Sequence, residues 1–176
     1  MIRREKVRVV VDDATIAAGQ VGEIIQPVWW LSTIYNGPGM YEESLKPFSR
    51  PQRLVRALLI YMYEVNNGGH KQFFSNSAGL VWRDAMDAFQ AIGLSRGANI
   101  LTIAGKRLGG DPSLDRGERQ EQLELHQPDF SDLDEALAEL RNKADVDQAI
   151  LKYIREQPSA FYFSGMVERV VLPRFR

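Results

Sequence analysis

Residues 64–79 read EVNNGGHKQFFSNSAG, and this stretch joins two segments that both have the hydrophobic pattern of a helix. The segment before it, 50–65, is apolar almost all round, which is typical of a central, buried helix. The Asn-Gly-Gly run at 67–69 predicts that this helix ends there and that the chain reverses, because glycine tolerates a positive φ. One or two helical turns should follow and carry Phe73 or Phe74 into the core.

The polar residues of this corner support two interpretations. In the first, Glu64 and His70 form an acid/base pair, and the amides of Asn66, Asn67, Gln72 and Asn76 orient a polar substrate. In the second, the same side chains hydrogen-bond the loose backbone groups of a tight corner between helices. We favour the second, because no further group of catalytic residues accompanies the stretch. We therefore expect no catalytic residue, with an enzyme or small-ligand pocket at this corner as the alternative.

Hydrophobic periodicity predicts further helices through most of the chain. Three of them start at residues suited to capping: Ser49 with Gln52 in the capping-box position, Ser131, and Asp145 with Gln148. Glycine or proline marks most of the helix ends. The predicted helices are 21–35, 41–45, 50–65, 80–92, 95–108, 113–124, 131–142 and a last one that Pro158 ends.

Strand signals lie near the two ends of the chain. The sequence KVRVVV at 6–11 alternates in the way of a strand, and PSAFYFSGMVERVVLP at 158–173 can supply one or two more. Pairing the two would protect the edges of both. The sequence therefore predicts a mainly all-α fold: a bundle-like array of helices in a single domain, 1–176, with a minor two-stranded element from the termini.

Composition and missing motifs exclude several classes of function. The chain has 176 residues and no cysteine, which removes disulfides, thiolate metal sites and cysteine nucleophiles. It has two histidines and lacks the common phosphate-binding, hydrolase, zinc-protease and calcium-loop motifs, so we predict neither a metal nor a cofactor. The apolar run near the start is too short for a secretory signal, and no run approaches the roughly 20 residues of a membrane span. We expect a cytoplasmic protein.

The net charge of −1 hides an uneven distribution of charged residues. Residues 1–110 carry +4, residues 111–147 carry −8 and residues 148–176 carry +3. The acidity is confined to one segment, whose field can select a basic partner. Within that segment Asp115 and Arg119 have the spacing of an ion pair along a helix.

The predicted helix 131–142 carries a row of carboxylates away from its leucine stripe, about 10 Å long. Such a row can imitate a few phosphates of a nucleic acid and capture a basic DNA-binding protein. It can equally be a solvated helix face. The row and the two residues that flank it are Asp132, Glu135 and Glu139 with Asp129 and Asp134.

The order of these features resembles the bacterial DNA-mimic protein family. The resemblance is carried by EVNNGGHKQFFSNSAG after a helix ending LIYMYEV, then WRDAMDAFQAIG, DRGER, DFSDLDEAL, and ILKYIREQP followed by AFYF. It covers about residues 25–165 and is most specific at one motif. The residues of this motif are Asn66, Asn67, Gly68, Gly69, His70, Gln72, Phe73, Phe74, Asn76 and Gly79.

The resemblance implies a helical domain without known enzymatic activity, in which the motif residues belong to the shared core. It also implies a mode of action, since a member of the family acts as an acidic dimer on the DNA-binding face of a helix-turn-helix transcription regulator. For this chain the expectation is a protein–protein interaction protein, possible as a homodimer, without direct contact to nucleic acid or membrane. Its near-neutral total charge differs from the strong acidity of a DNA mimic.

Overall fold

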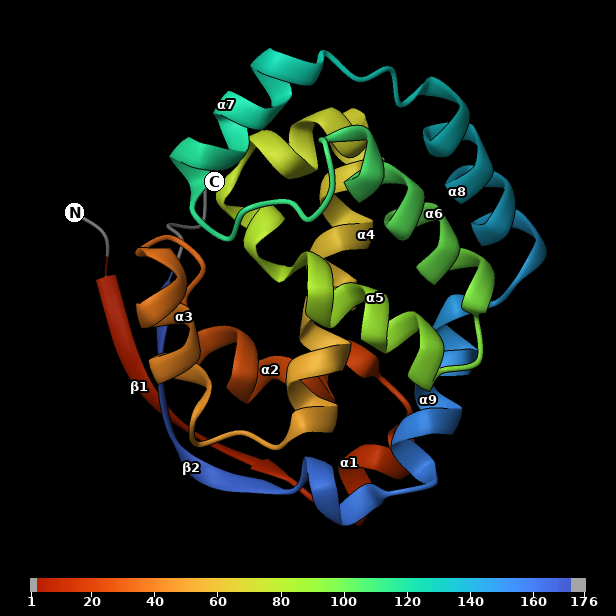
Figure 1. The fold of residues 1–176 in the computed structure, drawn as a ribbon. Helices are drawn as coiled ribbons and strands as arrows, with labels where there is room; N and C mark the ends of the chain where they lie inside the picture. The colour runs from red at the N-terminus through yellow and green to blue at the C-terminus, as the bar shows by residue number, and fades with distance from the viewer. Residues whose placement is uncertain (1–2, 172–176) are drawn as a thin grey trace, which may run out of the picture.

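The computed structural model describes residues 3–171, in which nine α-helices pack beside a two-stranded sheet (Figure 1). The expected mainly all-α fold is confirmed. The helices are α1 (Asp13–Ala18), α2 (Val21–Leu31), α3 (Gly37–Leu45), α4 (Arg50–Ser75), α5 (Trp82–Ala91), α6 (Ser95–Arg107), α7 (Arg116–His126), α8 (Ser131–Lys143) and α9 (Val146–Arg155). The other elements are the 3-10 helices η1 (Ser77–Val81) and η2 (Pro158–Phe161) and the strands β1 (Arg3–Val11) and β2 (Phe163–Val171).

The sheet joins the two ends of the described chain, as the sequence predicted. Strands β1 and β2 run antiparallel, with Val7 opposite Val167 and Val11 opposite Phe163. Val11 and Val167 are buried, and helix α2 lies against both strands. Figure 1 shows the sheet as a curved ribbon along one side of the helices.

Helix α4 is the centre of the fold, which confirms the prediction from its apolar sequence. It contacts α2, α5, α7 and α8, and it buries side chains such as Leu58 and Tyr61 completely. Its start has the predicted capping box: Ser49 Oγ accepts the Gln52 N–H over 3.2 Å, and Gln52 Oε1 accepts the Ser49 N–H over 2.9 Å. These reciprocal bonds satisfy two backbone donors that a helix start otherwise leaves free.

The predicted break in the central helix at 67–69 is confirmed, because α4 consists of two helical parts joined across a kink, the second of which ends at Ser75. Gly68 (φ −162°, ψ 24°) and Gly69 (φ 72°, ψ −179°) leave helical geometry there, and the positive φ of Gly69 explains the need for glycine. The turns beyond the kink bring both Phe73 and Phe74 into the core, where neither is exposed.

Several predicted helix boundaries are wrong, two of them for clear local reasons. Helix α2 ends at Leu31 rather than at 35, because Ser32 is extended (φ −121°, ψ 158°) and its hydroxyl donates back to the Val28 carbonyl. Helix α8 is capped by Phe130 and not by Ser131. The carboxylate of Asp129 instead accepts both the N–H and the hydroxyl of Ser131.

Candidate functional site

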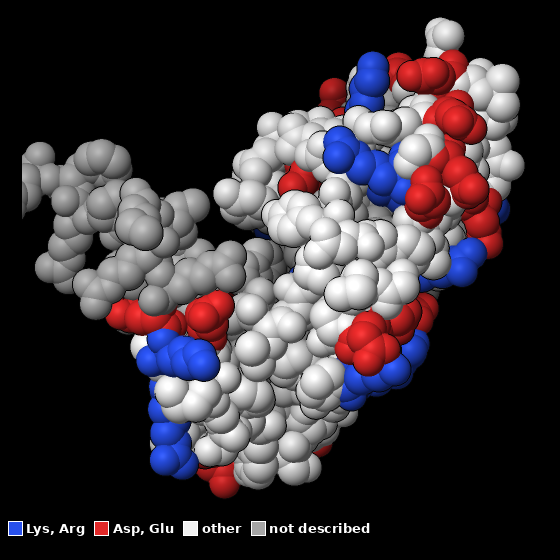
Figure 2. Space-filling model, turned by 90° about the vertical axis from the view of Figure 1, so that its left-hand side faces the viewer, with Lys and Arg blue, Asp and Glu red and all other residues white. Residues whose placement is uncertain are grey.

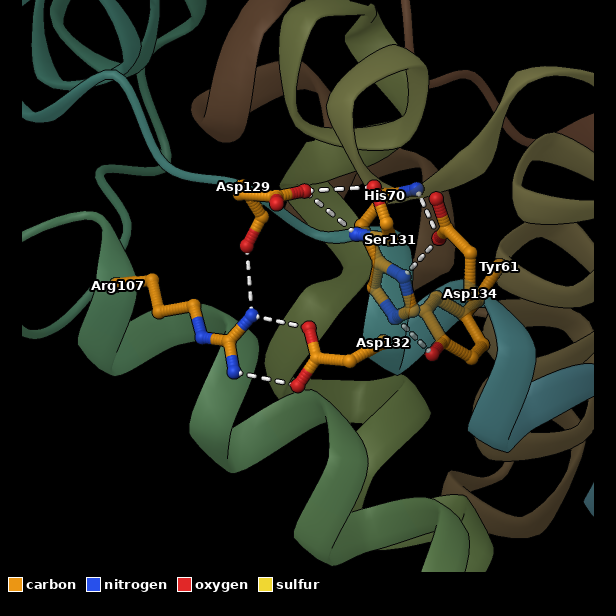
Figure 3. A network of polar contacts seen from close by, with 7 residues as sticks. All are labelled: Tyr61, His70, Arg107, Asp129, Ser131, Asp132 and Asp134. Carbon is orange, nitrogen blue, oxygen red and sulfur yellow. Dashed lines mark hydrogen bonds and ion pairs between the residues drawn. The ribbon is translucent and has the colours of Figure 1, made fainter.

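His70 follows the kink in α4 and is wholly buried. Its Nδ1 lies 2.5 Å from Oδ1 of Asp134, and its backbone N–H donates to the same oxygen over 2.9 Å. Its Nε2 lies 2.7 Å from the Tyr61 hydroxyl. Figure 3 shows the imidazole between these two side chains, one from α8 and one from the first part of α4. With Nδ1–H donating to the carboxylate, Nε2 accepts the Tyr61 proton, so a neutral ring satisfies both partners.

Burial also favours the neutral form of the His70 imidazole. Desolvation lowers the pKa of His70 below its usual value, although the hydrogen bond that His70 donates to Asp134 acts in the opposite direction. The pKa of Tyr61 is raised, first by burial and second by the charge of Asp134. The ring of Phe130 packs 5.8 Å from the imidazole centroid to centroid. A neutral, enclosed histidine with both nitrogens bonded is suited to joining α4 and α8.

Two glycines of the motif let these groups approach the backbone. A Cβ atom at Gly69 would lie 2.4 Å from Oδ2 of Asp134, too close for any real side chain. A Cβ atom at Gly79 would lie 2.9 Å from the Phe73 carbonyl oxygen and 2.4 Å from Nε of Arg119. The close contacts therefore give a physical reason for glycine at both positions.

Arg119 of α7 is a key residue of the corner that the sequence pattern did not reveal. The spacing predicted an ion pair with Asp115, but Arg119 is completely buried and donates to backbone carbonyls. Its Nε donates to Phe74 over 2.7 Å, its Nη2 to Asn76 over 2.8 Å and its Nη1 to Ser113 over 2.6 Å. The last carbonyls of a helix lack partners within it and favour a nearby cation. Arg119 thus satisfies carbonyls at the end of α4, and the helical spacing did not reveal these distant partners.

The residues of the predicted ligand pocket fall into separate groups. Glu64 Oε2 accepts from Gln72 Nε2 over 3.1 Å and from Asn76 Nδ2 over 3.0 Å, which ties the two parts of α4 together. His70 has other partners, and Asn67 is exposed. The acid/base pair of Glu64 and His70 is therefore not assembled: each of the two side chains is bonded to different groups.

Two carboxylates of the predicted acidic row form ion pairs with α6 or within α8. Arg107 binds Asp132 with two parallel hydrogen bonds of 2.5 and 2.7 Å, a strong geometry for this pair (Figure 3). Glu139 pairs with Arg96 and with Lys143, and these two cations hold its pKa at about 2. The row is therefore partly neutralised by the fold itself.

The remaining members of the acidic set lie differently from one another. Glu135 is exposed and forms no ion pair with another described residue. Asp129 is also exposed, and its bonds to Ser131 lower its pKa. Asp134 turns toward His70 instead of following the row outward.

A groove of about 980 Å³ lies between the end of α4 and α7. Its lining includes Gln72 and Gly68 of the motif but not His70. Figure 2 looks onto the side where α3 and α7 lie: charged side chains lie in the upper part, along the right-hand edge and at the lower left, and the middle of this side is largely uncharged. Within residues 3–171, no three histidine or acidic side chains gather closely enough to hold a metal ion. No helix in this range is long and apolar enough to cross a membrane.

A family model described as DMP19-like protein matches residues 46–157, which is more than half of the chain. The match runs from just before α4 to the end of α9, so it includes the corner and both acidic helices. No curated protein and no solved structure matches the chain.

Proposed function

The chain belongs to the DMP19-like protein family, and we propose that it acts without catalysis, by binding a basic protein through the acidic surface of α7 and α8. The partner class that fits its resemblance to DNA-mimic proteins is a DNA-binding regulator of the helix-turn-helix type. The concentration of charge supports this, since residues 111–147 carry −8 in a chain of net charge −1. A local field of this kind steers and selects basic partners.

The observation that carries the proposal is a set of exposed carboxylates left over for a partner. Glu121 and Glu124 on α7 and Glu135 on α8 are exposed, and none forms an ion pair with another described residue. Asp132 and Glu139, by contrast, already have cations of their own. The unpaired set, rather than the whole row, is therefore the part of the surface that can replace phosphate charge.

The test removes the unpaired charges and compares the result with an equal change elsewhere. The test variant carries E121Q, E124Q and E135Q, and the control carries E23Q, E43Q and E156Q, three exposed carboxylates outside segment 111–147. Both variants change the net charge by the same amount. Each is used to recover partners from the native cell at about 0.05 M and about 0.5 M salt, which shortens the screening length roughly threefold.

We expect the wild type and the control to recover a basic DNA-binding protein at low salt. The test variant should recover much less of it, and added duplex DNA should compete for the same partner. Recovery that is equal for the test variant and the control would contradict the acidic surface. A partner with no affinity for DNA would contradict mimicry while leaving protein binding intact.

A homodimer is the second part of the proposal, and it rests on the family resemblance alone. Light scattering coupled to size-exclusion chromatography measures the mass directly. A mass of about 40 kDa, twice the 20.0 kDa of one chain, is expected. A mass of one chain at all concentrations up to those in the cell would refute the dimer.

A further inference from the structure

Arg56 of α4 is buried without enough partners for its guanidinium. Only 4% of the residue is exposed, and neither Nε nor Nη1 has a hydrogen-bond partner among the described residues. Desolvation accordingly lowers its pKa. A buried cation with unbonded donors is costly, and a native fold keeps one where something else satisfies it.

The surrounding acidic groups are already engaged. Asp84 accepts a 2.7 Å hydrogen bond from the Tyr41 hydroxyl and lies 3.8 Å from Arg53. Glu64 accepts from two amides and lies eight residues further along α4, about 12 Å along the helix axis. Nε and Nη1 of Arg56 therefore have no acidic partner among the described residues.

A cavity of about 170 Å³ lies beside Arg56, between α4 and the end of α2. Trp29 stands on one side, with its ring centroid 6.0 Å from the guanidinium carbon. Tyr35 and Tyr63 line the cavity and are 79% and 66% exposed, so they lie at its mouth. Tyr35 belongs to the segment 32–36, which is neither helix nor strand.

The geometry points to a binding site for a small organic carboxylate, with its charged end at Arg56 and a flat apolar group against Trp29, Tyr35 and Tyr63. A guanidinium presents a planar set of donors that matches a carboxylate. Aromatic walls bind an apolar tail, and a few fixed polar groups orient it, which is the usual composition of a small-molecule site. Glu64 also lines the cavity, and its carboxylate repels an anion, so the charged end of the ligand should lie at Arg56 and away from Glu64.

The volume limits the size of the ligand. An engineered cavity of about 150 Å³ in another protein binds benzene, so 170 Å³ accepts one aromatic ring or a short branched chain. Benzoate is therefore the first probe. The same carboxylate chemistry also occurs at the end of a peptide, for which N-acetylphenylalanine is the probe. The uncharged counterparts, benzamide and N-acetylphenylalanine amide, have nearly the same shape without the charge.

Binding to the full chain is measured by titration calorimetry and by the fluorescence of the tryptophans. We expect saturable binding of benzoate and little binding of benzamide. Tighter binding of N-acetylphenylalanine than of benzoate identifies a peptide end as the natural source, and the reverse identifies a free acid. Failure of both acids to bind up to about 20 mM, where even weak fragments bind measurably, would overturn the inference. Equal binding of acids and amides would overturn it as well.

Two variants connect the binding to the site. R56M keeps the length of the side chain and removes its charge, so carboxylate affinity should fall roughly tenfold or more. Y63L changes an exposed residue at the mouth of the cavity, so it leaves the hydrophobic core intact. It should weaken binding several-fold. R50M removes an exposed arginine of the same helix and should bind like the wild type. Unchanged affinity in both R56M and Y63L would refute the site.

Discussion

Helix α4 ends near one buried arginine and carries another in its first half, and the two differ in how completely they are bonded. Arg119 is fully buried, and its three nitrogens donate to backbone carbonyls that include those of Phe74 and Asn76. Arg56 is almost as buried, but Nε and Nη1 have no partner among the described residues. One residue type thus completes the fold at one end of the helix and leaves donors unused at the other.

How completely a buried arginine is bonded indicates its role better than the residue type does. Full bonding indicates a structural role, and donors without partners indicate a binding role. At the Arg119 end, Gly69, His70 and Asp134 are in mutual contact, so each position is fixed by others. At the Arg56 end, a cavity replaces such contacts. A change at the first end should therefore reduce stability, and a change at the second should mainly alter what the protein binds.

The largest expected effect is that of R119M. The substitution removes the donors of the buried Phe74 carbonyl and of the partly buried Asn76 and Ser113 carbonyls, so the free energy of unfolding should fall by roughly 3–5 kcal/mol. Urea denaturation followed by circular dichroism measures this. R116M is the matched control, because Arg116 is exposed and bonds only the neighbouring Ser75 carbonyl; it should lose less than about 1 kcal/mol.

The next effect is that of G69A, which tests how closely α8 approaches the kink. Alanine there meets both the positive φ and the carboxylate of Asp134, so we expect a loss of roughly 2–4 kcal/mol. G93A is the control, because Gly93 has φ 79° and no heavy atom within 4 Å of an added Cβ. It should lose only the conformational part, about 1–2 kcal/mol. Equal losses in the two variants would mean that the approach of Asp134 contributes nothing.

The third effect is a dependence of stability on pH at the same end. Because burial lowers the pKa of His70, the unfolded chain takes up a proton there before the folded one does. The contribution of neutral His70 to the free energy of unfolding is thus fully present above about pH 6.5. It is lost as the pH decreases, by at most about 1.4 kcal/mol per pH unit. Urea denaturation between about pH 7.5 and about pH 5.5 measures the slope, at pH values above the lowered pKa of Glu139, about 2.

H70Q cannot titrate in this range, so its slope should be flatter than that of the wild type. It should also be less stable at pH 7.5, because Tyr61 and Asp134 lose the imidazole ring that bonds both of them. H126Q changes the exposed histidine and should keep the slope of the wild type. An H70Q protein of unchanged stability and slope would favour a ligand role for His70 over a structural one.

The sequence predicts the parts of this fold that depend on near neighbours. The capping box of Ser49 and Gln52 spans three residues, and its residue types allow few other arrangements. The alternating 6–11 run and the apolar face of α4 report burial directly. Asp129 could not be foreseen as the partner of Ser131, because both residue types compete for the same cap and only the backbone geometry decides.

The candidate site was harder to predict because its contacts join distant segments. Arg119 meets a carbonyl 45 positions away, and Asp134 meets His70 across 64. Helical spacing assigned Arg119 a local partner, since i,i+4 neighbours are the only ones that a sequence reveals. The motif glycines predicted a positive φ, which Gly69 has, but not the side chain that approaches them.

The smallest expected effect is a gain in stability, and it tests whether Arg56 and Arg119 differ in their roles. R56M replaces an underbonded buried cation by an apolar side chain of similar length, so the free energy of unfolding should rise by about 1 kcal/mol in the absence of a carboxylate. R56K is the control, because it keeps a buried charge and should show no such gain. Urea denaturation measures both variants. If R56M instead loses as much stability as R119M, both arginines are structural, and the cavity beside Trp29 has no claim to a ligand.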